Sequence, residues 1–122
     1  MPWVVRLHPD FVAELKAMPM AAQTELLAQA CVLERFGPQA GRPRVDTLKG
    51  SRHANMKELR FEAAGGVWRA AFAFDQRREA ALLAVGNKSA IGQSRFYRQL
   101  IDRADRRFTD HQSRLAAFDS RH

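Results

Sequence analysis

Several residue types and patterns that mark common functions are missing from this 122-residue chain. It has a single cysteine, Cys31, so no disulfide can form within the chain, and this fits a reducing compartment. No apolar run approaches the roughly 18 residues that span a bilayer, and the first residues lack the basic start and long apolar stretch of a signal peptide. We therefore expect a cytoplasmic protein with no membrane partner, and Cys31 as a small buried residue of a helix.

The motifs of the best-known metal, cofactor and nucleophile sites are absent as well. The chain contains no phosphate-binding P-loop, no Gly-rich dinucleotide turn and no Cys or His spacing typical of zinc. No serine lies in a nucleophile-elbow motif. The histidines are scattered along the chain and form no ligand pair in sequence: His8, His53, His111 and His122. We expect chemistry that uses no metal and no cofactor.

Positive charge is the strongest bias in what the chain does contain. Its 20 Lys and Arg exceed its 13 Asp and Glu, which gives a net charge of +7. With 46% hydrophobic and 27% charged residues, one folded domain is expected. Residues 1–40 have a net charge of −1 and residues 41–122 a net charge of +8. The partner should be an anion, such as nucleic acid, an acidic protein or a lipid surface, bound by the later two-thirds of the chain.

The hydrophobic pattern predicts an α+β fold with the element order β-α-α-β-β-β-α. Short apolar or alternating runs are typical of strands at residues 3–7, 56–62, 67–74 and 80–85. Apolar residues at helical spacing indicate helices at about 9–18, 20–36 and 93–108. We expect a domain over residues 1–109 and a polar tail over residues 110–122 that frays.

Short turns between the last three strands predict an antiparallel meander. One face would present the apolar residues, namely Leu59, Phe61, Trp68, Phe72 and Phe74, to the first two helices. The opposite face would carry Glu58, Arg60 and Arg69 around two small alanines and would form a shallow open groove. A carboxylate among guanidinium groups on a basic chain suggests a site for phosphate.

Cleavage of RNA without a metal requires three kinds of group. A base removes the proton of the ribose 2′-OH, cations stabilise the phosphate oxygens, and an acid protonates the 5′-oxygen. The candidate bases are Glu58 and His53. The candidate phosphate binders are Arg60, Arg69, Lys88 and Lys49, and Tyr97 could stack on a base or orient a phosphate. Further RNA-binding candidates lie in or beside the cationic loop at 39–55: Arg42, Arg44, Lys49, Arg52 and Lys57.

Each of these residues also has a purely structural interpretation. Glu58 could pair with Arg60 and Arg69 in a surface salt-bridge ladder, which contributes little by itself. His53 could be an ordinary loop residue, and Tyr97 could pack a helix against the sheet. The residues alone leave both interpretations open.

Four segments resemble the RelE/ParE toxin superfamily, in particular its HigB-like, phage-derived branch. They are Leu48-Lys49-Gly50-Ser51, Lys57-Glu58-Leu59-Arg60, Val67-Trp68-Arg69-Ala70-Ala71-Phe72 and Val85-Gly86-Asn87-Lys88. The resemblance covers roughly residues 3–108. It implies a cytoplasmic toxin of a type II toxin–antitoxin pair, with a helix-turn-helix antitoxin as partner.

The RelE and HigB members of this superfamily cut mRNA in the ribosomal A site, so the resemblance also implies the ribosome and mRNA as partners. The family pattern matches Glu58, Arg60, Arg69 and Lys88 directly, and Lys49, His53 and Tyr97 more loosely. RelE has lysines on the strand where this chain has Met56 and Glu58, so the catalytic set cannot be identical.

Two other functions are compatible with the sequence. A ParE-like toxin would act on DNA gyrase without cutting RNA, and a phage-derived protein without catalysis would only bind an antitoxin or nucleic acid. A gyrase-binding toxin has no need for a carboxylate with convergent cations on its sheet. We therefore favour the endoribonuclease.

Overall fold

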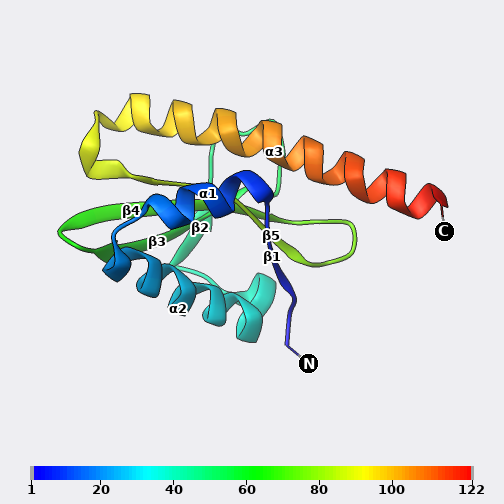
Figure 1. Cartoon of the computed structure of the whole chain (residues 1–122), viewed down its shortest axis with the longest axis horizontal. Coiled ribbons are helices and arrows are strands. Elements are labelled where there is room, and N and C mark those ends of the chain that lie inside the picture. Colours follow the sequence, from blue (N-terminus) through cyan, green and yellow to red (C-terminus); the bar gives the residue numbers. More distant parts are fainter. Residues whose placement is uncertain (1, 122) are drawn as a thin grey trace.

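A five-stranded sheet forms the middle layer of the protein, in the order β1-β5-β4-β3-β2 (Figure 1). The computed structural model describes residues 2–121. The strands are β1 (Val5–Leu7), β2 (Val45–Thr47), β3 (Lys57–Ala63), β4 (Gly66–Phe74) and β5 (Ala80–Asn87). The helices are α1 (Pro9–Ala17), α2 (Met20–Phe36) and α3 (Gln93–Arg121), with short 3-10 turns η1 (Gly37–Gln39) and η2 (Lys88–Ala90).

The predicted α+β class and the antiparallel meander β3-β4-β5 are confirmed, and β2 is an addition. The sequence predicted an unbroken loop over residues 39–55, but Val45–Thr47 pairs with β3, placing Asp46 opposite Glu58. Strand β1 pairs with β5 in parallel at the other edge of the sheet. The short edge strand β2 thereby brings a second acidic residue next to Glu58.

Helices α1 and α2 cover one face of the sheet, as predicted. Phe11 from α1 and Leu26 and Leu33 from α2 are fully buried in a core with sheet residues that include Leu59 and Phe72. The burial of large apolar side chains stabilises this layer by about 1.5–3 kcal/mol for each side chain. One expectation for α2 is wrong, because Cys31 is exposed on its outer side.

The opposite face of the sheet is not the open groove that the sequence predicted. Helix α3 covers it (Figure 1), and Phe96, Leu100 and Phe108 pack there against Ala71 and Leu83. The small side chains of β4 and β5 allow the helix to lie close to the strands, and the apolar stripe of α3 requires a cover. An accessible pocket remains on this face near Glu58.

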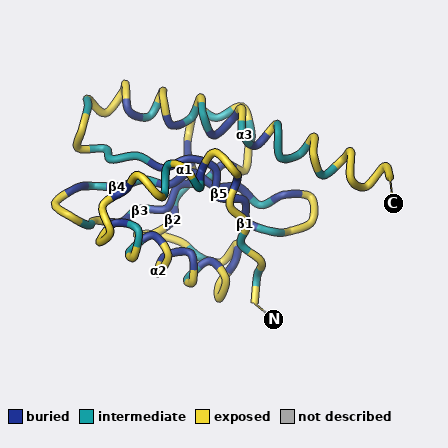
Figure 2. Tube along the Cα trace, in the orientation of Figure 1, coloured by how far each residue is buried: buried dark blue, intermediate teal, exposed yellow. Residues whose placement is uncertain are grey.

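The C-terminal part of α3 continues through residues 110–121, where a fraying tail was expected. Much of this extension is exposed (Figure 2), but side chains tie it to the turn between β4 and β5. His111 Nε2 lies 2.7 Å from Asp75 Oδ2, and Arg77 donates to Asp119 Oδ1 at 2.6 Å. Across residues 2–121, none of the helices has the length and apolarity needed to cross a membrane.

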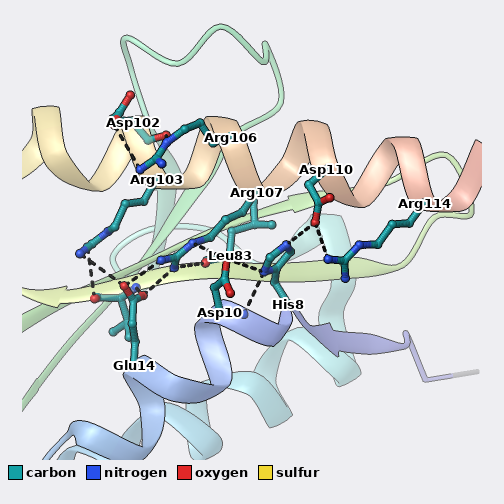
Figure 3. Close-up of polar contacts among 11 residues, drawn as sticks. His8, Asp10, Glu14, Leu83, Asp102, Arg103, Arg106, Arg107, Asp110 and Arg114 are labelled. Atoms are coloured by element: carbon teal, nitrogen blue, oxygen red, sulfur yellow. Dashed lines mark hydrogen bonds and ion pairs between the residues drawn. The ribbon is translucent and has the colours of Figure 1, made fainter.

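Side chains close the part of the β5 edge that the three-residue strand β1 leaves unpaired (Figure 3). The backbone N–H of Val85 donates to Glu14 Oε1 at 3.1 Å, and Arg107 donates to the carbonyl of Leu83 at 2.8 Å. Arg107 also forms a two-bond pair with Glu14, at 2.8 and 3.1 Å. Polar side chains thus bond backbone groups of β5 that β1 leaves unpaired.

Candidate functional site

Glu58 is the centre of a polar cluster at the accessible end of the α3-covered face. Its Oε1 accepts hydrogen bonds from Arg60 Nε at 3.0 Å and from the Tyr97 hydroxyl at 2.9 Å. Arg69 Nε lies 3.3 Å from the same oxygen and donates to the Tyr97 hydroxyl at 3.2 Å. The predicted neighbours Glu58, Arg60, Arg69 and Tyr97 are therefore in direct contact.

Exposure separates the roles of the two arginines in this cluster. The side chain of Glu58 is 4% exposed and that of Arg69 is 12% exposed, whereas that of Arg60 is 39% exposed. Arg69 Nη1 also donates to the Trp68 carbonyl at 2.9 Å, so a second N–H group of Arg69 is bonded within the protein. Arg60 is the arginine of the cluster that is better placed to meet a ligand.

Asp46 extends the cluster towards β2 and was missed in the sequence. Arg60 Nη2 lies 3.6 Å from Asp46 Oδ2, and Arg42 Nε lies 3.2 Å from the same oxygen. Carboxylates and arginines thus alternate from Glu58 through Arg60 and Asp46 to Arg42. The sequence signal for Asp46 was the run Val45-Asp46-Thr47 inside a loop rich in Gly and Pro. This run is too short to be identified as a strand from the sequence.

A pocket of about 350 Å³ opens over this cluster. Four cationic side chains line it, and we call them the pocket cations: Arg42, Lys49, Arg60 and Lys88. Glu58, Asp46, Tyr97 and Gln93 also line it. The ammonium group of Lys88 lies 5.6 Å from the centre of the Tyr97 ring, a cation–π distance. Positive groups from the cationic loop, β3 and η2 therefore converge on one hollow.

The environment fixes the protonation of three residues in this pocket. Burial is the main reason that the pKa of Tyr97 is raised, so its phenol keeps its proton at neutral pH. The hydrogen bond to Glu58 raises the pKa of Arg60. The backbone N–H of Thr47 is the main cause of the lowered pKa of Asp46, and Arg42 adds to it. The pocket therefore presents a neutral phenol beside charged arginines and a charged Asp46.

His53, predicted as a candidate base, lies away from this pocket. Its Nε2 is 3.1 Å from the Thr109 hydroxyl and its ring meets Phe108 edge-on, with ring centres 4.9 Å apart. Phe108 is 11 positions beyond Tyr97 on α3, which corresponds to about 16 Å along the helix axis. The geometry favours the structural interpretation for His53 that the sequence had left open.

Three of the other predicted RNA-binding residues also lie outside the pocket lining. Arg52 pairs with Asp105, its Nε at 3.7 Å from Oδ2. Lys57 alternates with Glu58 along β3, so its side chain leaves the sheet on the opposite face. Arg44 accepts a hydrogen bond from the Arg60 N–H through its carbonyl, while its side chain borders a separate hollow near the end of α2. Of the cationic loop, Lys49 and Arg42 reach the pocket.

Within residues 2–121, no three His, Cys, Asp or Glu side chains are grouped so that they could hold a metal ion. The arrangement is suited to a different task. Cations held by carboxylates, a neutral phenol and a hollow of nucleotide size can bind a phosphodiester and stabilise charge that develops on its oxygens.

The layered sheet, with two helices on one face and a C-terminal helix on the other, defines a RelE-like fold. A mutant of E. coli toxin RelE in the free state matches 84% of this chain and 98% of its own, with a TM-score of 0.58 and 13% identity. The archaeal RelE–RelB complex from Pyrococcus horikoshii OT3 contains a chain that matches 75% of this one and 100% of its own, with a TM-score of 0.51 and 22% identity. These similarities concern the fold.

The chain belongs to the family of phage-derived proteins described as Gp49-like, whose sequence profile matches residues 13–109. Two Mycobacterium tuberculosis (strain ATCC 25618 / H37Rv) proteins, assigned as toxins HigB2 and HigB3, are similar to it. The first is 47% identical over 89 residues, which are 72% of this chain and 42% of HigB2. The second is 46% identical over 103 residues, 84% of this chain and 88% of HigB3. The chain thus spans less than half of HigB2, and the predicted HigB-like, phage-derived relationship is confirmed.

Proposed function

We propose that this chain is the toxin of a type II toxin–antitoxin pair and that it cuts ribosome-bound mRNA. Its family membership, its similarity to proteins assigned as toxins and the RelE–RelB complex among its structural neighbours support a toxin with an antitoxin partner. The nuclease activity is supported by one observation above all. A nearly buried carboxylate, Glu58, holds two arginines and a phenol beside a pocket lined by four cations.

In the proposed reaction the ribose 2′-oxygen attacks phosphorus and the bond from phosphorus to the 5′-oxygen breaks. This leaves a cyclic phosphate on one fragment and a 5′-hydroxyl on the other. Arg60, Lys49 and Lys88 would bind the phosphate oxygens and stabilise the charge that builds on them in the transition state. Tyr97, which retains its proton until this step, would donate it to the departing 5′-oxygen and so complete the 5′-hydroxyl.

Glu58 has two linked tasks in this proposal. In the free protein its Oε1 accepts from Arg60 and Tyr97 and lies beside Arg69, so it positions these groups. Arg60 is the more exposed of the two arginines that contact Glu58, and a phosphate would draw it towards the substrate. The carboxylate oxygen that Arg60 leaves is then able to accept the 2′-OH proton.

The test is expression in bacteria with mapping of mRNA ends on ribosomes. We expect growth arrest and fragments that end inside codons at the A site. Arg60→Ala should lower cleavage about 10²- to 10³-fold, the loss typical for one donor to a developing oxyanion. The matched control is Arg106→Ala, an exposed arginine of α3 paired with Asp102 one turn away, and it should cleave normally.

The other outcomes separate the alternatives. Growth arrest with intact mRNA and a DNA-damage response would point to gyrase. Binding to an antitoxin without any growth arrest would point to a protein that has no catalysis. Either result would overturn the proposal that the chain is an endoribonuclease.

A further inference from the structure

A buried carboxylate outside the pocket, Asp105 on α3, contacts the loop between β2 and β3. Its Oδ1 accepts from the Ser51 hydroxyl at 2.5 Å, and its Oδ2 accepts from the Arg52 backbone N–H at 3.1 Å. The Arg52 guanidinium lies 3.7 Å away. The Asp105 side chain is only 8% exposed. A carboxylate in such a position is costly unless it is paired, and these partners all come from one loop.

The same loop is fixed at three further points. The Ser51 hydroxyl also accepts from the His53 backbone N–H at 3.0 Å, and the His53 ring lies against α3 at Thr109. Leu48 and Met56, at the two ends of the loop, are buried under α3 and joined by a backbone hydrogen bond of 3.0 Å. The ends are therefore held by the apolar core, and the segment between them is held by Asp105.

Lys49 lies between these anchors. It follows the buried Leu48, and it precedes Gly50, whose φ of +98° is a conformation that suits glycine. Lys49 lines the pocket, whereas Ser51 and Arg52 turn to α3. A lysine side chain has many rotamers, so its contribution to a phosphate site depends on where the backbone places it.

We propose that Asp105 is a positioning residue for the pocket: it clamps residues 51 and 52 to α3 and thereby places Lys49 where the phosphate binds. The pocket role of Lys49 rests on the proposed nuclease function, whereas the clamp itself does not. Through this clamp, the middle of α3 controls a cation that belongs to a different segment of the chain.

A double-mutant cycle tests the link between Asp105 and Lys49. Cleavage of ribosome-bound mRNA is measured for Asp105→Ala, Lys49→Ala and the double variant. We expect each single variant to lose about 10-fold or more, since small misplacements in a site are costly, and we expect the double variant to match Lys49→Ala. Asp105→Asn, which keeps one acceptor oxygen, should recover part of the loss. If the two single losses multiply in the double variant, Asp105 does not act through Lys49.

Amide hydrogen exchange tests the clamp without any RNA. Asp105→Ala and Ser51→Ala should each raise exchange at residues 50–54 about 10-fold or more, with the strands of the sheet unchanged. Asp102→Ala, an exposed acid one turn earlier on α3, is the matched control and should leave this loop protected. Unchanged exchange at residues 50–54 in both Asp105→Ala and Ser51→Ala would overturn the clamp. If the wild-type protein cuts no RNA, the nuclease proposal fails, and the exchange result still decides whether Asp105 holds the loop.

Discussion

Replacing Glu58 by glutamine keeps the shape of the side chain and removes its charge. Two hydrogen bonds and one ion pair converge on one oxygen: Arg60 Nε donates at 3.0 Å, the Tyr97 hydroxyl donates at 2.9 Å, and Arg69 Nε lies at 3.3 Å. A hydrogen bond to a charged group contributes about 1 kcal/mol more than one between neutral groups. The two hydrogen bonds and the ion pair with Arg69 together give about 3 kcal/mol, and the partly exposed position of Arg60 reduces this to about 2 kcal/mol.

Urea denaturation at pH 7 measures this loss of stability. With a slope near 1.5 kcal/mol per molar urea, a loss of about 2 kcal/mol lowers the midpoint by about 1.3 M. Glu62→Gln is the matched control, since Glu62 lies on the same strand and is exposed at its end. It should change stability by less than about 0.5 kcal/mol. Equal midpoints for the two variants would refute the conclusion that the Glu58 carboxylate holds the arginines.

The activity of the same variant separates the two tasks of Glu58. If Glu58 only positions its neighbours, the amide introduced by Glu58→Gln still accepts a hydrogen bond, and cleavage should fall less than about 10-fold. If Glu58 also accepts the 2′-OH proton, cleavage should fall about 10²- to 10⁴-fold, because the amide cannot take up a proton. We expect the larger loss, measured as single-turnover cleavage on ribosomes, and Glu62→Gln should cleave normally.

Three other predictions follow from the same geometry. RNA binding should weaken about 20- to 50-fold between 50 and 200 mM salt if three or four pocket cations neutralise phosphates. Lys88→Ala should reduce the slope of the logarithm of the binding constant against the logarithm of the salt concentration by about 0.7. An unchanged slope would contradict a contact between Lys88 and phosphate. Burial raises the pKa of Tyr97 above its ordinary value of 10.0, so the stabilising contribution of Tyr97 is present below pH 10 and is lost as pH rises through the folded pKa. Denaturation midpoints should therefore fall more steeply at high pH in the wild type than in Tyr97→Phe. Glu14→Ala should lower the free energy of unfolding by about 3 kcal/mol, since it removes the carboxylate that pairs with Arg107 and accepts from the Val85 N–H. A loss no greater than that of Arg106→Ala would argue against the capped β5 edge.

Much of the fold was predictable because its signals are local. Pro19 and Gly37 bracket α2, whose predicted limits agree with the structure. The alternation in 56–62 and 67–74 correctly placed Leu59 and Phe72 towards the first two helices. Alternation also placed Glu58 with Arg60 and Arg69, because residues on one face of paired strands are close wherever the register puts them.

The main differences between prediction and structure concern contacts between distant segments. The groove over Ala71 and Ala73 was predicted to be open because nothing in the strand sequence shows which helix covers it. His53 was one of two candidate bases, whereas the structure packs its ring on α3. The β2 strand has only three residues, and its pairing with β3, rather than its propensity, makes it a strand.

The sequence by itself determined the order of the helices and of every strand except β2, the meander, and the presence of a carboxylate among cations on one sheet face, because short-range periodicity carries that information. The tertiary structure alone decided how the site is built. Packing of α3 buries Glu58 and Arg69, leaves Arg60 accessible, brings Tyr97 to the carboxylate and, through Asp105, holds the loop that carries Lys49. Exposure and long-range hydrogen bonds depend on the whole fold, so no local pattern can report them.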